Sequence, residues 1–443
     1  MKRSGWIITG VVLLAVVVLA VWLGRRPGGF IGGPREIQWW HAMTGALNDR
    51  VNEMVERYNK SQTEVKIVAT FKGSYPETIN QTIAAFRAKK QPHMVQVFEV
   101  GTLTMMTSGA IYPVHQLMTD TGHNIDWSKF VQPVMSYYVT AENQLLSMPF
   151  NSSTPIFYYN KDHFAKAGIK AAPKTWDDVT AAIKKLKASG QACAYTTSWQ
   201  SWVHLENYSA LHQIPFASEA NGFKGLNAEL KFNNPQTIKH ITRLQGWAKA
   251  GAFAYEGRTN QGSAAFYGGK CSMLTESSAG YANVTKNAKF AWDATTMPTE
   301  TGATNTNSII GGATLWVLQG HGKEDYAAVA KFLNFIASTD NQTWWHQQTG
   351  YVPITLAAYE KSKADGYYKQ VPVQEIALKQ LTRAKPTEIS RGLRLGNFVQ
   401  IRTVIDEEME EVWNGKKSPK DALDSAARRG NQLLREFEQM SKK

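Results

Sequence analysis

Hydrophobic and polar positions follow two different periods along the first hundred residues of the chain. Residues 36–40, 65–69 and 94–98 are short apolar or alternating stretches, which is the pattern of β-strands. Residues 75–89 repeat their apolar side chains at helical spacing, and so does the segment before the second strand, through Leu47, Val51, Met54, Val55 and Tyr58. This β-α-β-α-β order predicts an α/β fold, with helices on both faces of a sheet.

The same pattern starts again near residue 150, which predicts a second lobe. A strand is expected at 155–159 and a helix at 176–189, opened by a capping box of Thr175 and Asp178. Further helices are expected at 234–249 and 323–338, and a buried strand at 309–318. A charged helix from Ser418 closes the chain, with its buried side formed by Leu423, Ala426, Ala427, Leu433, Leu434 and Phe437. We expect lobe 1 to comprise 36–150 with 300–342, and lobe 2 to comprise 151–299 with 343–443.

The N-terminus has the pattern of an export signal. An apolar run of 19 residues, 6–24, lies between Lys2 and Arg3 on one side and Arg25 and Arg26 on the other. As a helix it would span about 28 Å, close to the thickness of bilayer hydrocarbon. Residues 1–26 are therefore either a cleaved signal peptide or an uncleaved anchor, followed by a linker at 27–35. Either alternative places the rest of the chain outside the cytoplasm.

Composition limits the classes of protein that fit. With 43% hydrophobic and 19% charged residues, the chain can form ordinary cores, and its length favours two domains. The net charge is +13, but the four basic residues of the leader leave +9 for the rest. These charges are scattered among acids, so nucleic acid binding is not expected. The excess suits attraction to anions or simple solubility.

Signatures of catalysis and of metal binding are absent from the sequence. G-x-S-x-G, H-E-x-x-H and C-x-x-C do not occur, and residues 268–270 are interpreted as a turn rather than a phosphate loop. Cys193 and Cys271 form at most one disulfide, which the sequence does not decide. We expect no cofactor and no metal. An acidic cluster on the predicted surface of a helix is interpreted as a solvated face: Asp406, Glu407, Glu408, Glu410 and Glu411.

Aromatic and hydroxyl residues offer the candidate chemistry. Trp199 and Trp202 lie three residues apart, so a helix would place both indoles on one face, either in a core or as a platform for a polyol or sugar. Residues 150–155 carry three hydroxyls and an amide at the expected crossing between the lobes, where a plain turn is the alternative.

Two other segments suit anions. Residues 277–280 precede an expected helix, so they form either an ordinary N-cap or an anion site at the positive end of the helix dipole. Arg391, Arg394 and Arg402 lie close together in sequence, and a guanidinium forms a fork that fits phosphate or carboxylate. We expect one of the three to bind such a group.

From about residue 38 to the C-terminal helix, the chain resembles the extracellular solute-binding proteins of bacterial ABC importers, in particular members that bind sn-glycerol 3-phosphate. The family also includes the maltose-binding proteins. The most specific stretches are 70–75, 97–102, 149–155, 199–202, 309–313, 349–355 and 392–397. The resemblance implies an α/β, two-lobed periplasmic-binding-protein fold of type II, in which each lobe is a sheet flanked by helices and a ligand cleft lies between the lobes.

The resemblance also implies the ligand contacts. They are Tyr75, Glu99, Ser153, Trp199, Trp202, Ser277, Gly312, Tyr351 and Arg402. Arg402, with hydroxyls and the Gly312 N–H, would bind the phosphate, and Glu99 would accept hydrogen bonds from the glycerol hydroxyls. We expect Arg402→Ala to abolish binding without unfolding the protein. The expected partners are a glycerol phosphate or a diester such as glycerophosphocholine, the ABC permease and, through it, the ATPase. A monomer in the periplasm or otherwise outside the cytoplasm is expected; if the N-terminal segment is an uncleaved anchor, it would hold the protein at the cytoplasmic membrane.

Two alternatives stay open at this point. An oligosaccharide receptor of the same fold would use the aromatic residues equally well but would not need Arg402 or Ser277. A secreted hydrolase would need a metal cluster or a pair of carboxylates, and the sequence offers Glu99 as its one credible buried acid.

Overall fold

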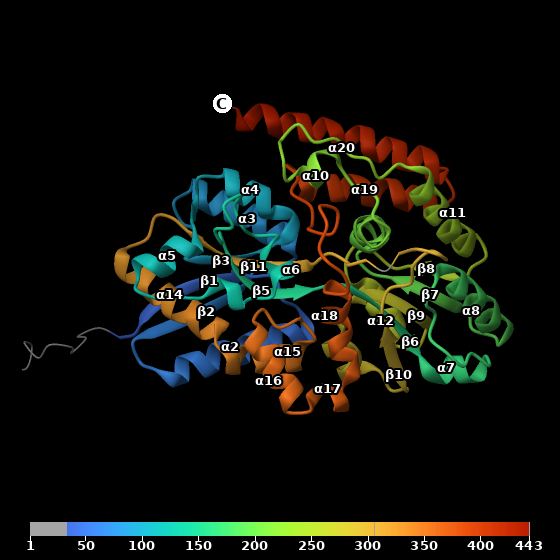
Figure 1. Ribbon diagram of the computed structural model, residues 1–443, viewed down its shortest axis with the longest axis horizontal. Helices are drawn as coiled ribbons and strands as arrows, with labels where there is room; N and C mark the ends of the chain where they lie inside the picture. The colour runs from blue at the N-terminus through green and yellow to red at the C-terminus, as the bar shows by residue number, and fades with distance from the viewer. Residues whose placement is uncertain (1–32, 305, 443) are drawn as a thin grey trace, which may run out of the picture.

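Thr154 joins two separate β-sheets, each flanked by helices (Figure 1). The computed structural model describes residues 33–304 and 306–442. The predicted leader at 1–26 and most of the predicted linker lie outside the described residues. Within the described part of the chain, no helix combines the length and apolar character needed to cross a membrane.

The first sheet has the strand order β2-β1-β3-β11-β4, and β5 also pairs with β11. β1, β2 and β3 are mutually parallel, whereas β11 runs antiparallel to β3, β4 and β5. Its strands are β1 (Arg35–His41), β2 (Val65–Phe71), β3 (Met94–Phe98), β4 (Ile111–Tyr112), β5 (Met148–Ser153) and β11 (Gly311–Leu318). Its helices are α2 (Gly45–Ser61), α3 (Tyr75–Arg87), α4 (Thr102–Thr107), α5 (Val114–Asp120), α6 (Gln132–Met135) and α14 (Lys323–Ala337), with the 3₁₀ turns η1 (Glu99–Gly101) and η2 (Trp127–Lys129).

The second sheet has the order β10-β6-β9-β7-β8. Its strands are β6 (Pro155–Asn160), β7 (Cys193–Thr197), β8 (Phe253–Tyr255), β9 (Cys271–Ser277) and β10 (Trp292–Thr295). Its helices are α7 (Lys161–Lys166), α8 (Trp176–Ala188), the π-helix η3 (Trp202–Asn207), α9 (Tyr208–Leu211), α10 (Ser218–Gly222), α11 (Pro235–Lys249), α12 (Gln261–Tyr267) and α13 (Gly280–Asn287).

The C-terminal part of the chain is helical and contacts both halves of the molecule. α15 packs against α2 and α14, whereas α19 and α20 lie against each other and against α11 (Figure 1). These elements are α15 (Thr339–Thr349), α16 (Leu356–Ala364), α17 (Tyr367–Gln370), η4 (Pro372–Glu375), α18 (Ile376–Leu381), α19 (Phe398–Trp413) and α20 (Pro419–Ser441). The residue bounds expected for the two lobes stay a prediction.

Two segments of the chain cross between the sheets, and they lie side by side. One is Thr154, between β5 and β6; the other leads from β10 back to β11. The Thr154 hydroxyl donates to Ser308 Oγ at 2.7 Å and to the carbonyl oxygen of Ile309 at 3.0 Å, which ties the crossings together. Residues 150–155 are thus a strand end and a crossing, as expected, and not a plain turn.

Most of the predicted helices and strands are confirmed within a few residues. The capping box of Thr175 and Asp178 opens α8, as predicted. Cys193 and Cys271, whose pairing the sequence left open, are partners in the register of parallel β7 and β9 and form a disulfide. The strands β4, β5, β7, β8, β9 and β10 were not predicted.

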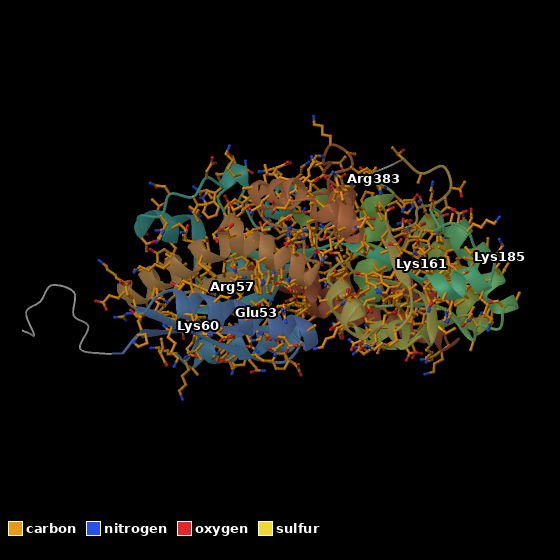
Figure 2. All side chains as sticks on the ribbon, turned by 90° about the horizontal axis from the view of Figure 1, so that it is seen from below. Glu53, Arg57, Lys60, Lys161, Lys185 and Arg383 are labelled. Atoms are coloured by element: carbon orange, nitrogen blue, oxygen red, sulfur yellow. A yellow bond between two sulfur atoms is a disulfide. The ribbon has the colours of Figure 1, made fainter. Side chains whose placement is uncertain are left out.

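The interpretation of the acidic cluster as a solvated face is wrong. Asp406 and Glu408 are buried, and Glu408 is paired with Lys417 and Arg429. Elsewhere charged side chains lie on the outer helices: Glu53, Arg57 and Lys60 on α2 in one half of the molecule, and Lys161 on α7 and Lys185 on α8 in the other (Figure 2).

Candidate functional site

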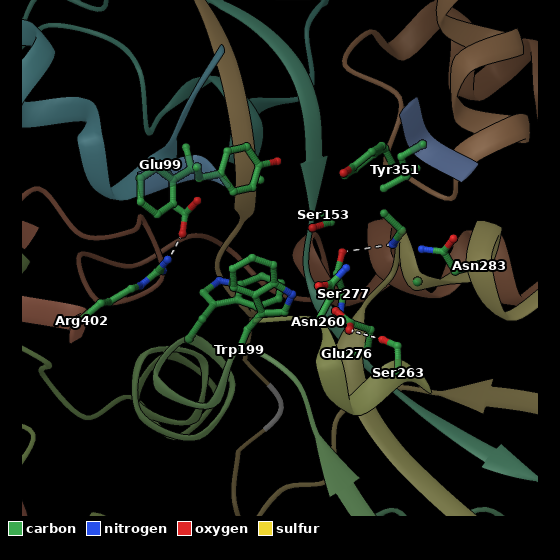
Figure 3. Close-up of a pocket in the computed structure, with 17 residues that line it drawn as sticks. Glu99, Ser153, Trp199, Asn260, Ser263, Glu276, Ser277, Asn283, Tyr351 and Arg402 are labelled. Carbon is green, nitrogen blue, oxygen red and sulfur yellow. Dashed lines mark hydrogen bonds and ion pairs between the residues drawn. The ribbon is translucent and has the colours of Figure 1, made fainter. Parts of the chain in front are cut away.

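A cavity of about 90 Å³ lies between the two sheets, and all nine expected ligand contacts line it (Figure 3). The first sheet and its helices contribute Tyr75, Glu99, Ser153 and Gly312; the second contributes Trp199, Trp202 and Ser277; the C-terminal segment contributes Tyr351 and Arg402. Residues more than three hundred positions apart in sequence therefore meet in one place. Their contact with a ligand stays a prediction.

Aromatic rings form one wall of the cavity. Tyr75 stacks on Phe98 with 5.2 Å between ring centroids, and the Trp199 ring lies 6.4 Å from Tyr75. The prediction that Trp199 and Trp202 share a helix face is wrong, because Trp199 precedes the helix, and its backbone has φ +50. A bulky residue in this left-handed region costs free energy, and such strain is concentrated at functional sites. Trp202 belongs to the core and to the cavity wall at once.

Two glycines of β11 lie beside the aromatic wall, and Gly312 lines the cavity. A Cβ on Gly311 would come within 2.5 Å of the Trp202 ring, so the missing side chain makes room for the indole. Gly312 has φ +94, and a Cβ there would lie 1.9 Å from the carbonyl oxygen of Asn151. The pairing of β11 with β5 therefore requires glycine at position 312. The missing side chain also leaves the backbone of Gly312 accessible from the cavity.

Arg402 lies between two buried carboxylates at one end of the cavity. Its Nε and Nη2 donate to the two oxygens of Glu206 at 2.7 Å each, and Nη2 also donates to Glu99. Burial raises the pKa of Glu99, although Arg402 counteracts the effect. The pKa of Arg402 is raised, because its attraction to Glu206 and Glu99 outweighs the effect of burial. The guanidinium charge is thus already compensated without a ligand.

The other two arginines of the sequence cluster have structural contacts. Arg394 is buried and donates through Nη2 to the carbonyl oxygens of Tyr137 and Val139 at 2.9 and 2.8 Å. Arg391 and Arg394 both lie over the ring of Phe223. Of the three candidates for anion binding, Arg402 is the one that lines the cavity.

Hydroxyl groups gather at the other end of the cavity. Figure 3 shows Ser153, Ser277 and Tyr351 away from the Arg402–Glu99 pair. Ser277 ends β9, and its Oγ accepts a hydrogen bond from the Ala279 N–H at 3.1 Å, just before α13 begins. Ala279 and Gly280 also line the cavity, so the positive end of the α13 dipole lies at this end.

A second buried acid, Glu276, lies beside these hydroxyls. Its carboxylate accepts hydrogen bonds from the Ser263 hydroxyl and from the Ser277 N–H, both at 2.6 Å. Burial raises its pKa, while its hydrogen-bond donors lower it. The expectation that Glu99 is the one credible buried acid is therefore wrong, because Glu206 and Glu276 are as deeply buried.

Sequence reasoning missed several residues of the site. They are Glu206, Glu276, Asn260, Ser263 and Asn283. The signal for Glu276 was present, because a lone acid in a strand of small and apolar residues must have buried donors. Glu206 carried no such signal, since its partner Arg402 lies 196 positions away.

One group outside the cavity has ligand types that suit a metal: His93, His321 and Asp325, whose candidate ligand atoms lie within 4.8 Å of one another. His93 Nδ1 accepts the Gln38 N–H at 3.0 Å, which leaves the proton of the neutral ring on Nε2. Asp325 accepts hydrogen bonds from Arg35 and from the Gly322 N–H. His321 Nε2 lies 3.1 Å from the Pro92 carbonyl oxygen, so each member of the group also has a partner in the protein.

Comparisons with known proteins add to this geometry. A family model described as bacterial extracellular solute-binding protein matches residues 53–370. The sn-glycerol-3-phosphate-binding periplasmic protein UgpB of Salmonella typhimurium is 49% identical over 412 residues, which cover 92% of this chain and 94% of that protein. UgpB of Escherichia coli strain K12 is 48% identical over 411 residues, with the same coverage.

Solved structures share the fold. UgpB from Mycobacterium tuberculosis, in complex with glycerophosphocholine, has a TM-score of 0.77 at 20% identity and covers 91% of this chain and 99% of its own. The GacH receptor of Streptomyces glaucescens has a TM-score of 0.74 at 16% identity, with 91% and 99% covered. These likenesses confirm the predicted two-lobed α/β fold of the periplasmic-binding type.

Proposed function

The chain belongs to the bacterial extracellular solute-binding proteins, and we propose that it is the receptor of an ABC importer for sn-glycerol 3-phosphate or glycerophosphodiesters such as glycerophosphocholine. The observation that carries the proposal is the convergence of nine expected contacts on one cavity between the lobes. Relatives at 48 and 49% identity, named for binding glycerol 3-phosphate, support the choice of ligand class.

We place the phosphate at the hydroxyl end of the cavity. Ser153, Ser277 and Tyr351 offer hydroxyl donors there, and the N-terminus of α13 adds the positive end of its dipole. This changes the role expected for Arg402, whose charge is already balanced by Glu99 and Glu206.

We place the glycerol hydroxyls at the other end. Glu99 accepts hydrogen bonds from hydroxyls, and Arg402 donates, so the pair suits a neutral polyol better than an anion. Trp199 and Trp202 cover the carbon skeleton of the ligand from the side. The ligand would then lie along a cavity with one polyol end and one anion end.

Ligand binding is expected to close the lobes. Contacts from both sheets are made together only in a closed form, so the ligand stabilises that form. We propose that the closed form is what the permease recognises, and that the protein works outside the cytoplasm. We also propose that it releases its ligand unchanged, because the cavity presents binding groups and no metal site among the described residues.

Tryptophan fluorescence tests this function, because Trp199 and Trp202 line the cavity. Titration with sn-glycerol 3-phosphate, glycerophosphocholine and maltose should give a saturable change with a phosphorylated ligand. Ser277→Ala should weaken that response, while the exposed-surface control Ser61→Ala should not. The ligand recovered after overnight incubation should be intact. A hydrolysed ligand would contradict the proposed function as a receptor. A response to maltose alone would transfer the function to sugar uptake.

A further inference from the structure

Glu276 is the acidic group closest to the hydroxyl end of the cavity. Its backbone neighbour Ser277 is an expected phosphate contact, and the Glu276 carboxylate accepts the Ser277 N–H at 2.6 Å. Its other oxygen accepts the Ser263 hydroxyl at 2.6 Å (Figure 3). The side chain lines the cavity, yet the residue is only 2% exposed. A negative charge on this group is therefore poorly screened by water.

No cation lies beside this carboxylate among the described residues of the cavity lining. The groups that lower its pKa are neutral donors, from Ser198, Ser263, Trp199 and the Ser277 backbone. The titratable groups that face it are Tyr158 from β6 and Tyr351 from the segment after α15. Arg402 is the one basic residue of the lining, and it is paired with two carboxylates.

The number of charges on the ligand then decides how well it fits. A phosphate monoester has a second pKa near about 6 and carries close to two negative charges at pH 8, whereas a phosphodiester carries one. A second charge in this cavity must either lie near an ionised Glu276 or be offset by uptake of a proton. In either case, binding costs more free energy for the dianion than for the monoanion.

We propose that Glu276 is a specificity-determining residue that makes the cavity select phosphodiester monoanions over the phosphate monoester dianion. The inference rests on the proposed function, because it assumes that the phosphate lies at the hydroxyl end. It narrows that function to glycerophosphodiesters as the ligands preferred at neutral and alkaline pH.

Calorimetric titration of the purified protein between pH 5.5 and 8.5 tests this selectivity. The probes are glycerophosphocholine, glycerophosphoglycerol and sn-glycerol 3-phosphate. At pH 8 we expect both diesters to bind at least about tenfold more tightly than the monoester. The monoester should gain affinity as the pH falls through about 6, where it becomes a monoanion. The diesters should change much less.

Two variants make the test specific. Glu276→Gln should raise affinity for the monoester by about tenfold at pH 8 and leave both diesters within about twofold; Glu276→Ala serves if the first variant does not fold. Glu256→Gln removes one charge from the exposed Glu256–Lys270 pair and should leave the preference unchanged.

The outcomes separate this inference from the function on which it rests. Equal affinity for the monoester and the diesters at pH 8 would overturn the proposed selectivity. So would a Glu276→Gln variant that prefers diesters as strongly as the wild type does. Either result would leave the proposed receptor function standing. Tight binding of glycerophosphocholine without glycerophosphoglycerol would also overturn it, because recognition of the cationic head group would then explain the preference. Failure of every phosphorylated probe at every pH would reject the receptor as well.

Discussion

Arg402 and Glu206 form a buried bidentate ion pair, with 2.7 Å from Nε to Oε1 and 2.7 Å from Nη2 to Oε2. Glu99, which follows β3 of the first sheet, pairs with the same guanidinium, whereas Glu206 belongs to η3 beside the second sheet. Arg402 therefore links the two halves of the molecule through charges that are largely shielded from water.

Arg402→Ala should destabilise the protein as well as abolish binding, contrary to the expectation from the sequence. Removal of one partner leaves the buried carboxylates of Glu99 and Glu206 uncompensated, which costs about 3–5 kcal/mol. Urea denaturation of the ligand-free protein measures the loss. Arg50→Ala, which breaks the exposed pair with Glu53, should cost no more than about 1 kcal/mol. An unchanged unfolding free energy for Arg402→Ala would contradict the structure.

Gly311→Ala should weaken ligand binding, because its Cβ would come within 2.5 Å of the Trp202 ring and displace the indole from the cavity wall. Calorimetry with glycerophosphocholine measures the effect. Gly246→Ala is the matched control: Gly246 lies in α11, and no atom lies within 4 Å of its added Cβ. It should leave binding unchanged and stabilise the helix by about 0.5–1 kcal/mol. Equal effects of the two substitutions would argue against the Trp202 contact.

Asp406 should make the protein less stable as the pH rises. Burial raises the pKa of Asp406 from 3.8 to about 7. Between these values the folded state keeps a proton that the unfolded state has released, so stability falls as the pH rises from about 4 to about 7, by up to about 4 kcal/mol.

Asp406→Asn removes this contribution, so its stability relative to the wild type should increase over that pH window. Urea denaturation at pH 4.5 and pH 8 measures the difference, with the exposed-site substitution Asp365→Asn as a control that should show no such trend. A constant difference between Asp406→Asn and the wild type would mean that this carboxyl is ionised at both pH values.

Reduction of the disulfide should destabilise the protein. The Cys193–Cys271 bond closes a loop with a sequence separation of 78 between the neighbouring strands β7 and β9. Its loss is expected to cost about 2–5 kcal/mol. Thermal unfolding with and without dithiothreitol measures this, and the double variant Cys193→Ala/Cys271→Ala should match the reduced wild type. A melting temperature that dithiothreitol leaves unchanged would mean that the bond contributes little.

The sequence predicted those elements that form a clear apolar run or repeat apolar residues at regular spacing. β3 is a short, mostly apolar run that is buried throughout, and α8 repeats its apolar residues at helical spacing, so both fall at their expected residues. β5 was missed because Pro149 and the polar residues 151–153 do not look like a strand, although they are buried between the sheets. β7 and β9 consist largely of small and hydroxyl residues that are buried on both faces, so neither strand shows alternation.

The site was predictable residue by residue only through the family resemblance. Convergence of Tyr75 and Arg402 on one cavity depends on the arrangement of the two sheets, which no local pattern encodes. The charge balance was not predictable either: the Arg402 partners Glu99 and Glu206 lie 303 and 196 positions away in the sequence. Arg402 alone looked like a phosphate ligand, and its partners change that interpretation.

Calorimetric titration with sn-glycerol 3-phosphate, glycerophosphocholine and maltose in parallel tests the proposed receptor most directly. We predict saturable one-to-one binding of at least one phosphorylated ligand and no binding of maltose. Binding of maltose alone would keep the fold and contradict the placement of a phosphate beside Ser153 and Ser277.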